Sequence, residues 1–243
     1  ATDIAIGLGY DQTDAISILS AKQLDTWKIS FEELFQKAQD NLWEKTTNRF
    51  HSPHPGVYAS PYGDSHDAAR LLFWELIVQN EVKGIPVIAV PDRDTLIITG
   101  SEDLAGLEYL AAACETALEQ IRLVSTKPLI LDDRRWTALR LPEDHPLYAR
   151  FRMCEMQETM SDYTEQKALL QTLYEQRGED VFVSTFSATQ NQDSGRISSY
   201  CVWSNDVVAD LPRTDRIAFM QNEKEILGWG SWAEATTAFG HLM

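Results

Sequence analysis

The first strong pattern along the chain is a row of apolar side chains at helical spacing. Its members are Phe31, Leu34, Phe35, Ala38 and Leu42. Residues three and four apart lie on one face of a helix, so the row predicts an amphipathic helix over residues 31–45 whose apolar stripe packs into the core. Ser30 and Glu33 have the spacing of a capping box, in which each side chain binds the backbone N–H of the other, and this pair predicts where the helix begins.

The next segments alternate between polar loops and apolar runs. Residues 46–56 contain two prolines and a glycine, which predict a loop, and residues 57–62 predict a short strand. Residues 68–78 carry apolar side chains on almost every side and follow Asp64 and Ser65, either of which can cap a helix. This segment therefore predicts a helix that is buried on most of its surface.

Two β-rich runs, residues 85–90 and 95–99, predict a β-hairpin. They are separated by Pro-Asp-Arg-Asp at residues 91–94. Proline fixes its own φ angle and aspartate side chains accept hydrogen bonds from nearby backbone, as tight turns require. Ser101 is placed to cap a further helix, whose apolar stripe runs through residues 104–121.

The second half begins with a strand-like stretch over residues 129–141, interrupted at residues 132–135. Two helices are then predicted, one over residues 148–156 and one over residues 163–176 that is capped by Ser161 and ended by Gly178. Four strands and a closing helix complete the pattern, at residues 181–189, 199–203, 207–211, 216–220 and 231–241.

The two halves share the order helix, strand, hairpin, helix. Their hairpins align without a gap, because Pro91, Asp94, Leu96 and Ile98 lie 121 residues before Pro212, Asp215, Ile217 and Phe219. An internal duplication explains this match, and chance similarity between short hairpins is the alternative. We predict an α+β protein of two related helix-strand-hairpin-helix units, residues 1–125 and 126–243, with mixed or antiparallel sheets covered by helices and a joint near residues 122–145.

Composition places the chain among globular proteins, and its charge narrows the choice of partners. Apolar residues make up 44% and charged residues 24% of the 243 residues, which is typical of folded domains. The chain has 21 Lys and Arg against 37 Asp and Glu, for a formal net charge of −16 that is spread over both halves. Such a surface repels nucleic-acid phosphates and anionic lipid, so we expect neither nucleic acid nor a membrane as a partner. It favours a basic protein partner instead.

Cysteine usage and hydropathy predict a cytoplasmic protein without a membrane span. Cys114, Cys154 and Cys201 are an odd number at wide spacing, which argues against a disulfide framework or a zinc site. The longest strongly apolar stretch, residues 71–78, contains Glu75 and is far shorter than the roughly 20 residues that a spanning helix needs. Residues 1–10 lack the features of an intact secretory signal, although a cleaved signal would leave no trace.

Three of the five histidines, His51, His54 and His66, lie within 16 residues of one another and beside Asp64. Imidazole and carboxylate groups are suitable ligands for zinc, so these four residues are candidate metal ligands. Their spacing matches no motif with a known mechanism, and the alternative is a polar loop followed by a helix cap. The four residues support one enzymatic hypothesis, a metal-dependent hydrolase in which the ion activates water.

Other catalytic motifs are absent from the sequence. It contains no GxSxG, GxxxxGK[ST] or HExxH pattern, and Gly7-Leu8-Gly9 lacks the third glycine of a dinucleotide site, so we expect no cofactor. Cys114 lies on an apolar stripe and Cys201 shares a strand face with Trp203, so both cysteines are expected to pack in the core rather than to act as nucleophiles.

The candidate binding residues lie at the two hairpin turns and on one strand. They are Asp92, Arg93, Asp94, Asp215 and Trp203. The four charged residues lie in the predicted turns, where aspartate is also common for purely conformational reasons. Trp203 is a candidate because exposed tryptophans anchor protein interfaces. Like Trp229 and Trp232, it can instead be part of the core.

Several short segments resemble the YtpQ-like family of uncharacterised bacterial proteins. They are Ser-Phe-Glu-Glu-Leu-Phe at residues 30–35, Asn41-Leu42, Val-Pro-Asp-Arg-Asp-Thr-Leu at residues 90–96, and Thr99-Gly100-Ser101. The resemblance covers residues 20–125 best and is looser beyond, where Tyr163, Gln166 and Val202-Trp203 align. It implies a bacterial, intracellular protein without an assigned activity, and it transfers no catalytic residue.

Two functions follow from the sequence. The first is a non-catalytic acidic binding protein that engages a basic protein partner, for example an immunity protein that neutralises a toxin. The second is the metal-dependent hydrolase that uses His51, His54, Asp64 and His66. A housekeeping scaffold without a dedicated ligand is a third alternative, and nothing in the sequence indicates the oligomeric state.

Overall fold

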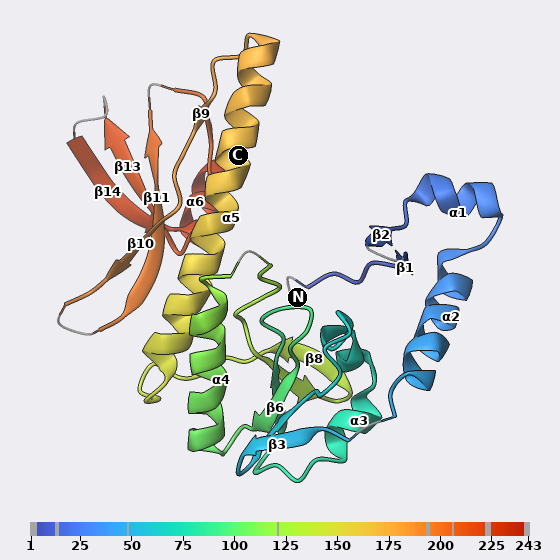
Figure 1. Cartoon of the computed structure of the whole chain (residues 1–243). Helices are drawn as coiled ribbons and strands as arrows, with labels where there is room; N and C mark the ends of the chain where they lie inside the picture. Colours follow the sequence, from blue (N-terminus) through green and yellow to red (C-terminus); the bar gives the residue numbers. More distant parts are fainter. Residues whose placement is uncertain are drawn as a thin grey trace. The chain divides into compact units, whose positions relative to one another are not determined.

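The chain divides into two units, Ala1–Arg140 and Leu141–Met243, and each unit combines helices with β-strands (Figure 1). The computed structural model describes residues 4–12, 15–47, 49–120, 122–192, 195–205, 207–221 and 225–240. The strands form antiparallel and mixed sheets, so the fold class is α+β, as the sequence predicts.

An antiparallel six-stranded sheet forms the centre of the N-terminal unit. Its order is β3 (His51–His54), β4 (Val57–Ala59), β6 (Ile97–Gly100), β5 (Pro86–Ala89), β7 (Leu129–Asp132) and β8 (Arg135–Ala138). The predicted hairpin is confirmed as the pair β5–β6, and the interrupted strand-like stretch predicted after residue 129 forms the pair β7–β8. Aliphatic side chains fill the core beside this sheet, and full burial of each contributes about 1.5–3 kcal/mol. They are Ile77, Ile88, Val90, Leu96, Ile98 and Leu129.

Helix α4 (Leu104–Ala117) approaches β6 closely at Gly106. A Cβ atom on Gly106 would overlap the Thr99 hydroxyl and lie 2.9 Å from the Thr99 Cβ atom. The Thr99 hydroxyl is itself fixed, because it donates a hydrogen bond to the Gly56 carbonyl at 3.0 Å. The helix is capped by Asp103, whose carboxylate accepts a hydrogen bond from the Gly106 N–H at 3.2 Å, so the prediction of Ser101 as the cap is wrong.

Most of the apolar stripe predicted for α4 faces the core. Leu107, Ala111 and Cys114 are buried, which confirms the packing role expected of this cysteine. Leu104, at the start of the helix, is exposed instead. The last predicted member of the stripe, residue 121, lies outside the described residues.

Helix α2 (Phe31–Glu44) begins where the sequence predicts, but its apolar stripe is not buried. Ser30 and Glu33 form the capping box, in which the Glu33 N–H donates to Ser30 Oγ at 3.2 Å and the Ser30 N–H donates to Glu33 Oε2 at 3.0 Å. All residues of α2 are described and none is buried, so the predicted core stripe is wrong. The helix belongs to an N-terminal segment with β1 (Gly9–Asp11), β2 (Ile16–Ile18) and α1 (Ala21–Trp27).

Residues 46–78 differ from the prediction in two places. Strand β3 forms inside the predicted loop and pairs with β4. The predicted helix over residues 68–78 is divided at Phe73 into the 3-10 helix η1 (Ala68–Leu72) and α3 (Trp74–Val78). Phe73 has φ −98° and ψ 75°, which is not a helical conformation. Arg70, in η1, is fully buried and brings polar contacts into a segment that the sequence predicts to be packed by apolar groups.

Helix α5 (Tyr148–Arg177) runs without a break through the C-terminal unit, whereas the sequence predicts two helices there. Ser161 lies exposed inside the helix and does not cap it, and an exposed serine is tolerated in a helix interior. Gly178 ends α5 with a φ of +65°, as predicted, because glycine adopts this left-handed conformation without strain. Within the described ranges, no helix has both the length and the apolar character needed to cross a membrane.

A mixed four-stranded sheet lies beside α5 and α6 (Trp232–Phe239) (Figure 1). Its order is β10 (Ser187–Gln190), β11 (Ile197–Ser204), β13 (Arg216–Gln221) and β14 (Glu225–Ser231), with β11 and β13 parallel. Met156 of α5 packs on Ile197, and Ala235 of α6 packs with Cys201 and Ile217, so Cys201 has the expected core role. A separate parallel pair joins β9 (Phe182–Val183) to β12 (Ala209–Asp210). Strand β14 is not predicted by the sequence, and residue 241 of the predicted closing helix lies outside the described residues.

The boundary between the two units lies between Arg140 and Leu141 in the sequence, and the β7–β8 hairpin belongs to the first unit because it pairs with β5. This boundary lies within the joint predicted near residues 122–145, whereas a division between residues 125 and 126 would separate the hairpin from its sheet. The internal duplication is not shown. The segment expected to match the β5–β6 hairpin forms β12 and β13, which lie in different sheets, and β13 pairs in parallel with β11.

The variant Gly106→Ala tests the close packing of α4 on β6. Alanine is favoured over glycine inside a helix by about 1 kcal/mol, so the helix alone would gain stability. We expect a net loss of about 1–3 kcal/mol in the free energy of unfolding, because the added methyl group overlaps the Thr99 hydroxyl. Urea unfolding measures this loss.

The matched control is Ala105→Gly, on the exposed side of the same turn, which should cost about 1 kcal/mol through helix propensity alone. A Gly106→Ala variant more stable than the parent protein would show that the contact with Thr99 is not tight.

Candidate functional site

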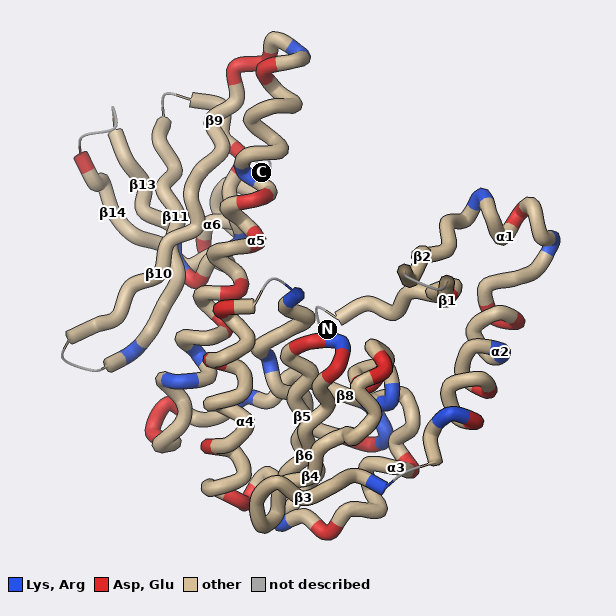
Figure 2. The backbone as a smooth tube through the Cα atoms, in the orientation of Figure 1, with Lys and Arg blue, Asp and Glu red and all other residues tan. Residues whose placement is uncertain are grey.

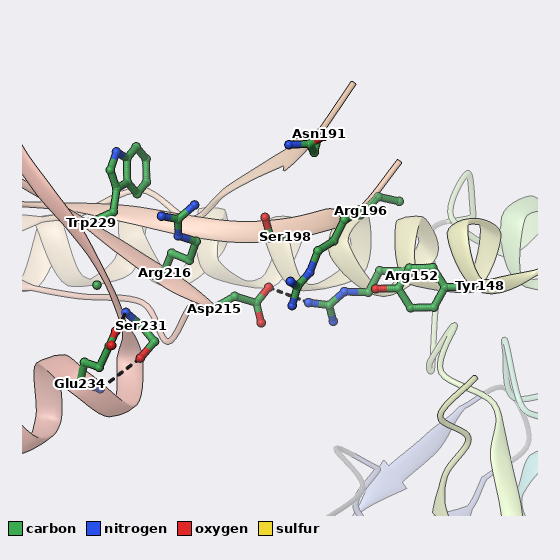
Figure 3. A pocket seen from close by; sticks show the side chains of 12 residues that line it. Tyr148, Arg152, Asn191, Arg196, Ser198, Asp215, Arg216, Trp229, Ser231 and Glu234 are labelled. Carbon is green, nitrogen blue, oxygen red and sulfur yellow. Dashed lines mark hydrogen bonds and ion pairs between the residues drawn. The ribbon is translucent and has the colours of Figure 1, made fainter. Parts of the chain in front are cut away.

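Asp215 lies immediately before β13 and connects three elements of the C-terminal unit (Figure 3). Its Oδ2 atom accepts hydrogen bonds from the Ser199 N–H at 2.8 Å, from the Ser199 hydroxyl at 2.9 Å and from Arg152 Nη2 at 2.7 Å. The Asp215 N–H donates in return to Ser199 Oγ at 2.9 Å. Because Arg152 belongs to α5 and Ser199 to β11, Asp215 joins α5, β11 and β13.

The strand pairing explains why this position needs a carboxylate. The parallel pairing of β11 with β13 begins at Tyr200 and Arg216, so Ser199 and Asp215 lie just ahead of the ladder. Ser199 is buried, and a buried N–H without a partner costs about 1–3 kcal/mol. Partial burial would raise the pKa of Asp215, but the hydrogen bonds from Ser199 and the charge of Arg152 outweigh it and hold the pKa below its usual value.

Arg152 is held between two carboxylates. Its Nη1 donates to Glu155 Oε2 and its Nη2 donates to Asp215 Oδ2, each at 2.7 Å, and its side chain is 17% exposed. Burial favours the neutral guanidine, yet the hydrogen bonds and charges of the two carboxylates raise the pKa of Arg152 above its ordinary value. The side chain is therefore a fixed, charged part of the C-terminal unit.

Arg152 and Asp215 line a cavity of about 690 Å³. Arg196, Arg216 and Trp229 also line it (Figure 3). The Arg216 guanidinium lies 4.9 Å from the centre of the Trp229 ring, and Tyr200 meets the same ring edge-on with 5.6 Å between the ring centres. Arg196 Nε lies 3.3 Å from Glu143 Oε1. Three guanidinium groups thus face one cavity in a chain whose net charge is −16.

The exposed side of α4 is a second surface of distinct charge. We call it the α4 acidic face, and it consists of exposed residues of the helix and of its two flanks: Glu102, Leu104, Glu108, Tyr109, Glu115 and Glu119. The sequence has no Lys or Arg between Arg93 and Arg122, and the charged residues within α4 are all acidic (Figure 2). Lys83 approaches the start of the helix, where its Nζ atom lies 3.9 Å from Asp103 Oδ2.

The predicted residues of the first hairpin turn have local structural roles. Asp92 accepts a hydrogen bond from the Asp94 N–H at 2.7 Å, and Asp94 accepts one from the Ser65 N–H at 2.6 Å. The Arg93 carbonyl accepts one from the Ala68 N–H at 3.1 Å. The turn therefore holds the segment that leads into η1, which accounts for both carboxylates without a partner molecule.

Trp203 belongs to an aromatic cluster at one end of the four-stranded sheet. Its ring centre lies 6.0 Å from those of Phe219 and Phe239. It packs against the core around Cys201 and is partly buried. Trp203 and Asp215 line different cavities, so the structure does not bring these two predicted binding residues into one site.

The four predicted metal ligands are all described, and they do not form a metal site. His51 and His54 lie at the two ends of β3, Asp64 lies in the next loop, and His66 lies just before η1. Among the described residues, no three or more His, Cys, Asp or Glu side chains form a group that could hold a metal ion. The His66 Nε2 atom lies 3.3 Å from Asp11 instead. The metal-dependent hydrolase thus lacks the geometry that it requires.

Asp64 instead forms a bidentate ion pair with the fully buried Arg70. Arg70 Nη1 and Nη2 donate to the two Asp64 oxygens at 2.9 and 2.8 Å, and Arg70 Nε donates to Thr46 Oγ1 at 3.0 Å. The guanidinium also lies 3.5 Å from the centre of the Tyr62 ring. The hydrogen bonds from Arg70 lower the pKa of Asp64 to about 2, against the effect of burial. This geometry is typical of strong arginine–carboxylate pairs, and here it fixes the loop before η1.

Sequence reasoning misses the arginines of the cavity. Arg152 lies in α5, Arg196 just before β11 and Arg216 at the start of β13, so no spacing along the chain links them. One local signal is readable: Ser231 and Glu234 have the spacing of a capping box. The Glu234 N–H donates to Ser231 Oγ at 3.2 Å and the Ser231 N–H donates to Glu234 Oε2 at 2.7 Å, which fixes the start of α6 beside the cavity.

The variant Asp64→Asn tests the pair with Arg70. The pKa of this carboxyl falls from 3.8 to about 2 on folding, so the pair stabilises the fold fully above pH 3.8 and less as the pH falls toward 2. We expect a loss of about 2 kcal/mol in the free energy of unfolding at neutral pH, because Arg70 loses a charged acceptor. The difference from the parent protein should shrink in acid, as urea unfolding at several pH values would show.

Asp132→Asn, at an exposed position in β7, is the control and should change stability little at any pH. Equal stability of Asp64→Asn and the parent protein at neutral pH would contradict the structural role of the pair.

Comparison of the chain with models of protein families, with curated proteins and with solved structures found no match. Membership of the YtpQ-like family therefore stays a prediction from the sequence. Site geometry and surface charge are the observations from which a function is inferred.

Proposed function

We propose that this protein is a non-catalytic binding protein that engages a basic protein partner through the α4 acidic face. The observation that carries the proposal is the charge of this face. It presents four exposed glutamates on a stretch of sequence that has no Lys or Arg between Arg93 and Arg122. Opposite charges across an interface favour a basic partner and repel acidic competitors.

The charge of the whole chain supports the same proposal. Residues 1–140 contain 21 Asp and Glu against 13 Lys and Arg, and residues 141–243 contain 16 against 8, so each unit carries a net charge of −8. Some of the cations are already paired with carboxylates, as Arg70 and Arg152 are. A field of this sign attracts a cationic domain from a distance and raises its association rate.

Exposed apolar groups on the same face would increase the affinity for the partner, in addition to the electrostatic effect on the association rate. Leu104 is 46% exposed and Tyr109 is 37% exposed, and tyrosine is enriched among the residues that dominate binding energy at interfaces. A basic toxin domain neutralised by an immunity protein is the class of partner that we propose. The three cysteines are described, buried and not joined in disulfides, which suits the reducing cytoplasm that we propose as the compartment.

Charge reversal on the α4 acidic face should weaken the binding of a cationic probe. The double variant Glu108→Lys, Glu119→Lys replaces two attractive contacts by two repulsive ones, and each exposed contact is worth up to about 1 kcal/mol. We therefore expect the dissociation constant for an oligolysine peptide to rise about tenfold or more in calorimetric titration. Binding should fade at about 1 M salt, where the Debye length is about 3 Å.

The matched control is Asp162→Lys, Glu165→Lys, which changes the net charge equally on an exposed part of α5. This control should retain most of the affinity of the parent protein. If both double variants lose affinity equally, the net charge of the chain rather than the α4 acidic face governs binding, and the proposed interface is wrong.

A further inference from the structure

The cavity beside Asp215 takes no part in the proposed interaction at α4, and its charge differs from that of the surrounding unit. Residues 141–243 contain eight Lys and Arg, and three of them line this cavity: Arg152, Arg196 and Arg216. Small-molecule sites in proteins have volumes of about 300–1,000 Å³. The volume of about 690 Å³ found here lies within that range.

The three arginines differ in how firmly they are held. Arg152 is fixed by its two carboxylates, as described above. Arg196 meets Glu143 at 3.3 Å, with 65% and 59% of the two side chains exposed, and an exposed pair of this kind contributes little stability and exchanges readily. Arg216 makes no ion pair with any residue whose position is described. Its guanidinium lies over the face of Trp229, a contact that leaves its N–H groups available as donors.

The two carboxylates that line the cavity are already engaged within the fold. Asp215 Oδ2 accepts its three hydrogen bonds from Ser199 and Arg152. Glu234 Oε2 accepts a hydrogen bond from the Ser231 N–H at 2.7 Å in the capping box of α6. The groups best placed to interact with a bound molecule are therefore Arg196 and Arg216, with Ser198 drawn between them in Figure 3.

We propose that this cavity binds a small organic anion, a carboxylate or a phosphate ester joined to an apolar body. Arg196 and Arg216 bind the anionic group, because planar guanidinium groups match the oxygens of carboxylate and phosphate. The apolar body packs on Trp229, which is 45% exposed. Arg152 and Asp215 are positioning residues that hold α5, β11 and β13 around the site.

Glu143 would compete with a bound anion for Arg196, and this competition can be measured. Its carboxylate is the acceptor of the exposed pair with Arg196, so an incoming anion competes with it for the same guanidinium. Removal of this competitor by Glu143→Gln should tighten anion binding. A cluster of arginines with a purely structural role would show no such gain.

Calorimetric titration with phenyl phosphate and with benzoate tests the proposal and separates phosphate from carboxylate as the bound group. We expect saturable binding of one molecule of at least one probe. Affinity should fall about tenfold in Arg196→Gln and in Arg216→Gln, each of which removes a charged donor. Affinity should rise about two- to threefold in Glu143→Gln. Circular dichroism confirms that each variant is folded.

Arg213→Gln is the matched control, because Arg213 is exposed in the same unit and its side chain does not line the cavity. It removes the same charge and should leave the affinity unchanged, as should the double variant of Glu108 and Glu119. The proposal is overturned if neither probe binds saturably, if Arg213→Gln weakens binding as much as Arg216→Gln, or if Glu143→Gln fails to tighten it. Failure of the oligolysine experiment has no bearing on these outcomes.

Discussion

The carboxylate of Asp215 is the interaction on which the C-terminal unit depends. Parallel strands cannot be joined by a tight turn, so the register of β11 and β13 relies on contacts such as the bond from the buried Ser199 N–H to Asp215. The same carboxylate oxygen binds Arg152 and thereby brings α5 to the end of the two strands. The cavity follows from this arrangement, since Arg152 forms its fixed wall and Arg216 is the residue after Asp215.

Both units of this acidic chain use a partly or fully buried arginine to fix a segment of irregular backbone. Arg70 binds Asp64 in the loop that leads into η1, and Arg152 binds Asp215 at the start of β13. Opposite charges are thus paired inside each unit, while the glutamates of α4 remain on the surface. The fold depends on the internal pairs, and the proposed partner would respond to the surface charge, so substitutions can separate the two roles.

Local signals in the sequence predict much of the fold and little of the site. The capping box of Ser30, the turn at residues 91–94 and the helix end at Gly178 act through residues a few positions away, and all three are confirmed. The parallel pairing of β13 with β11, by contrast, depends on contacts that are distant in sequence. Asp215 is a predicted binding residue only because of a hairpin that does not form. Its hydrogen-bond partners Ser199 and Arg152 are 16 and 63 residues away in sequence, too far for any spacing rule to identify them.

A double-mutant cycle on Asp215 and Arg152 tests most directly whether this pair holds the C-terminal unit together. Asp215→Asn, Arg152→Gln and the double variant are compared with the parent protein by urea unfolding at neutral pH. The ion pair predicts a coupling energy of about 1 kcal/mol or more, because the two side chains contact each other and share one network. Additive losses, with a coupling energy near zero, would contradict it.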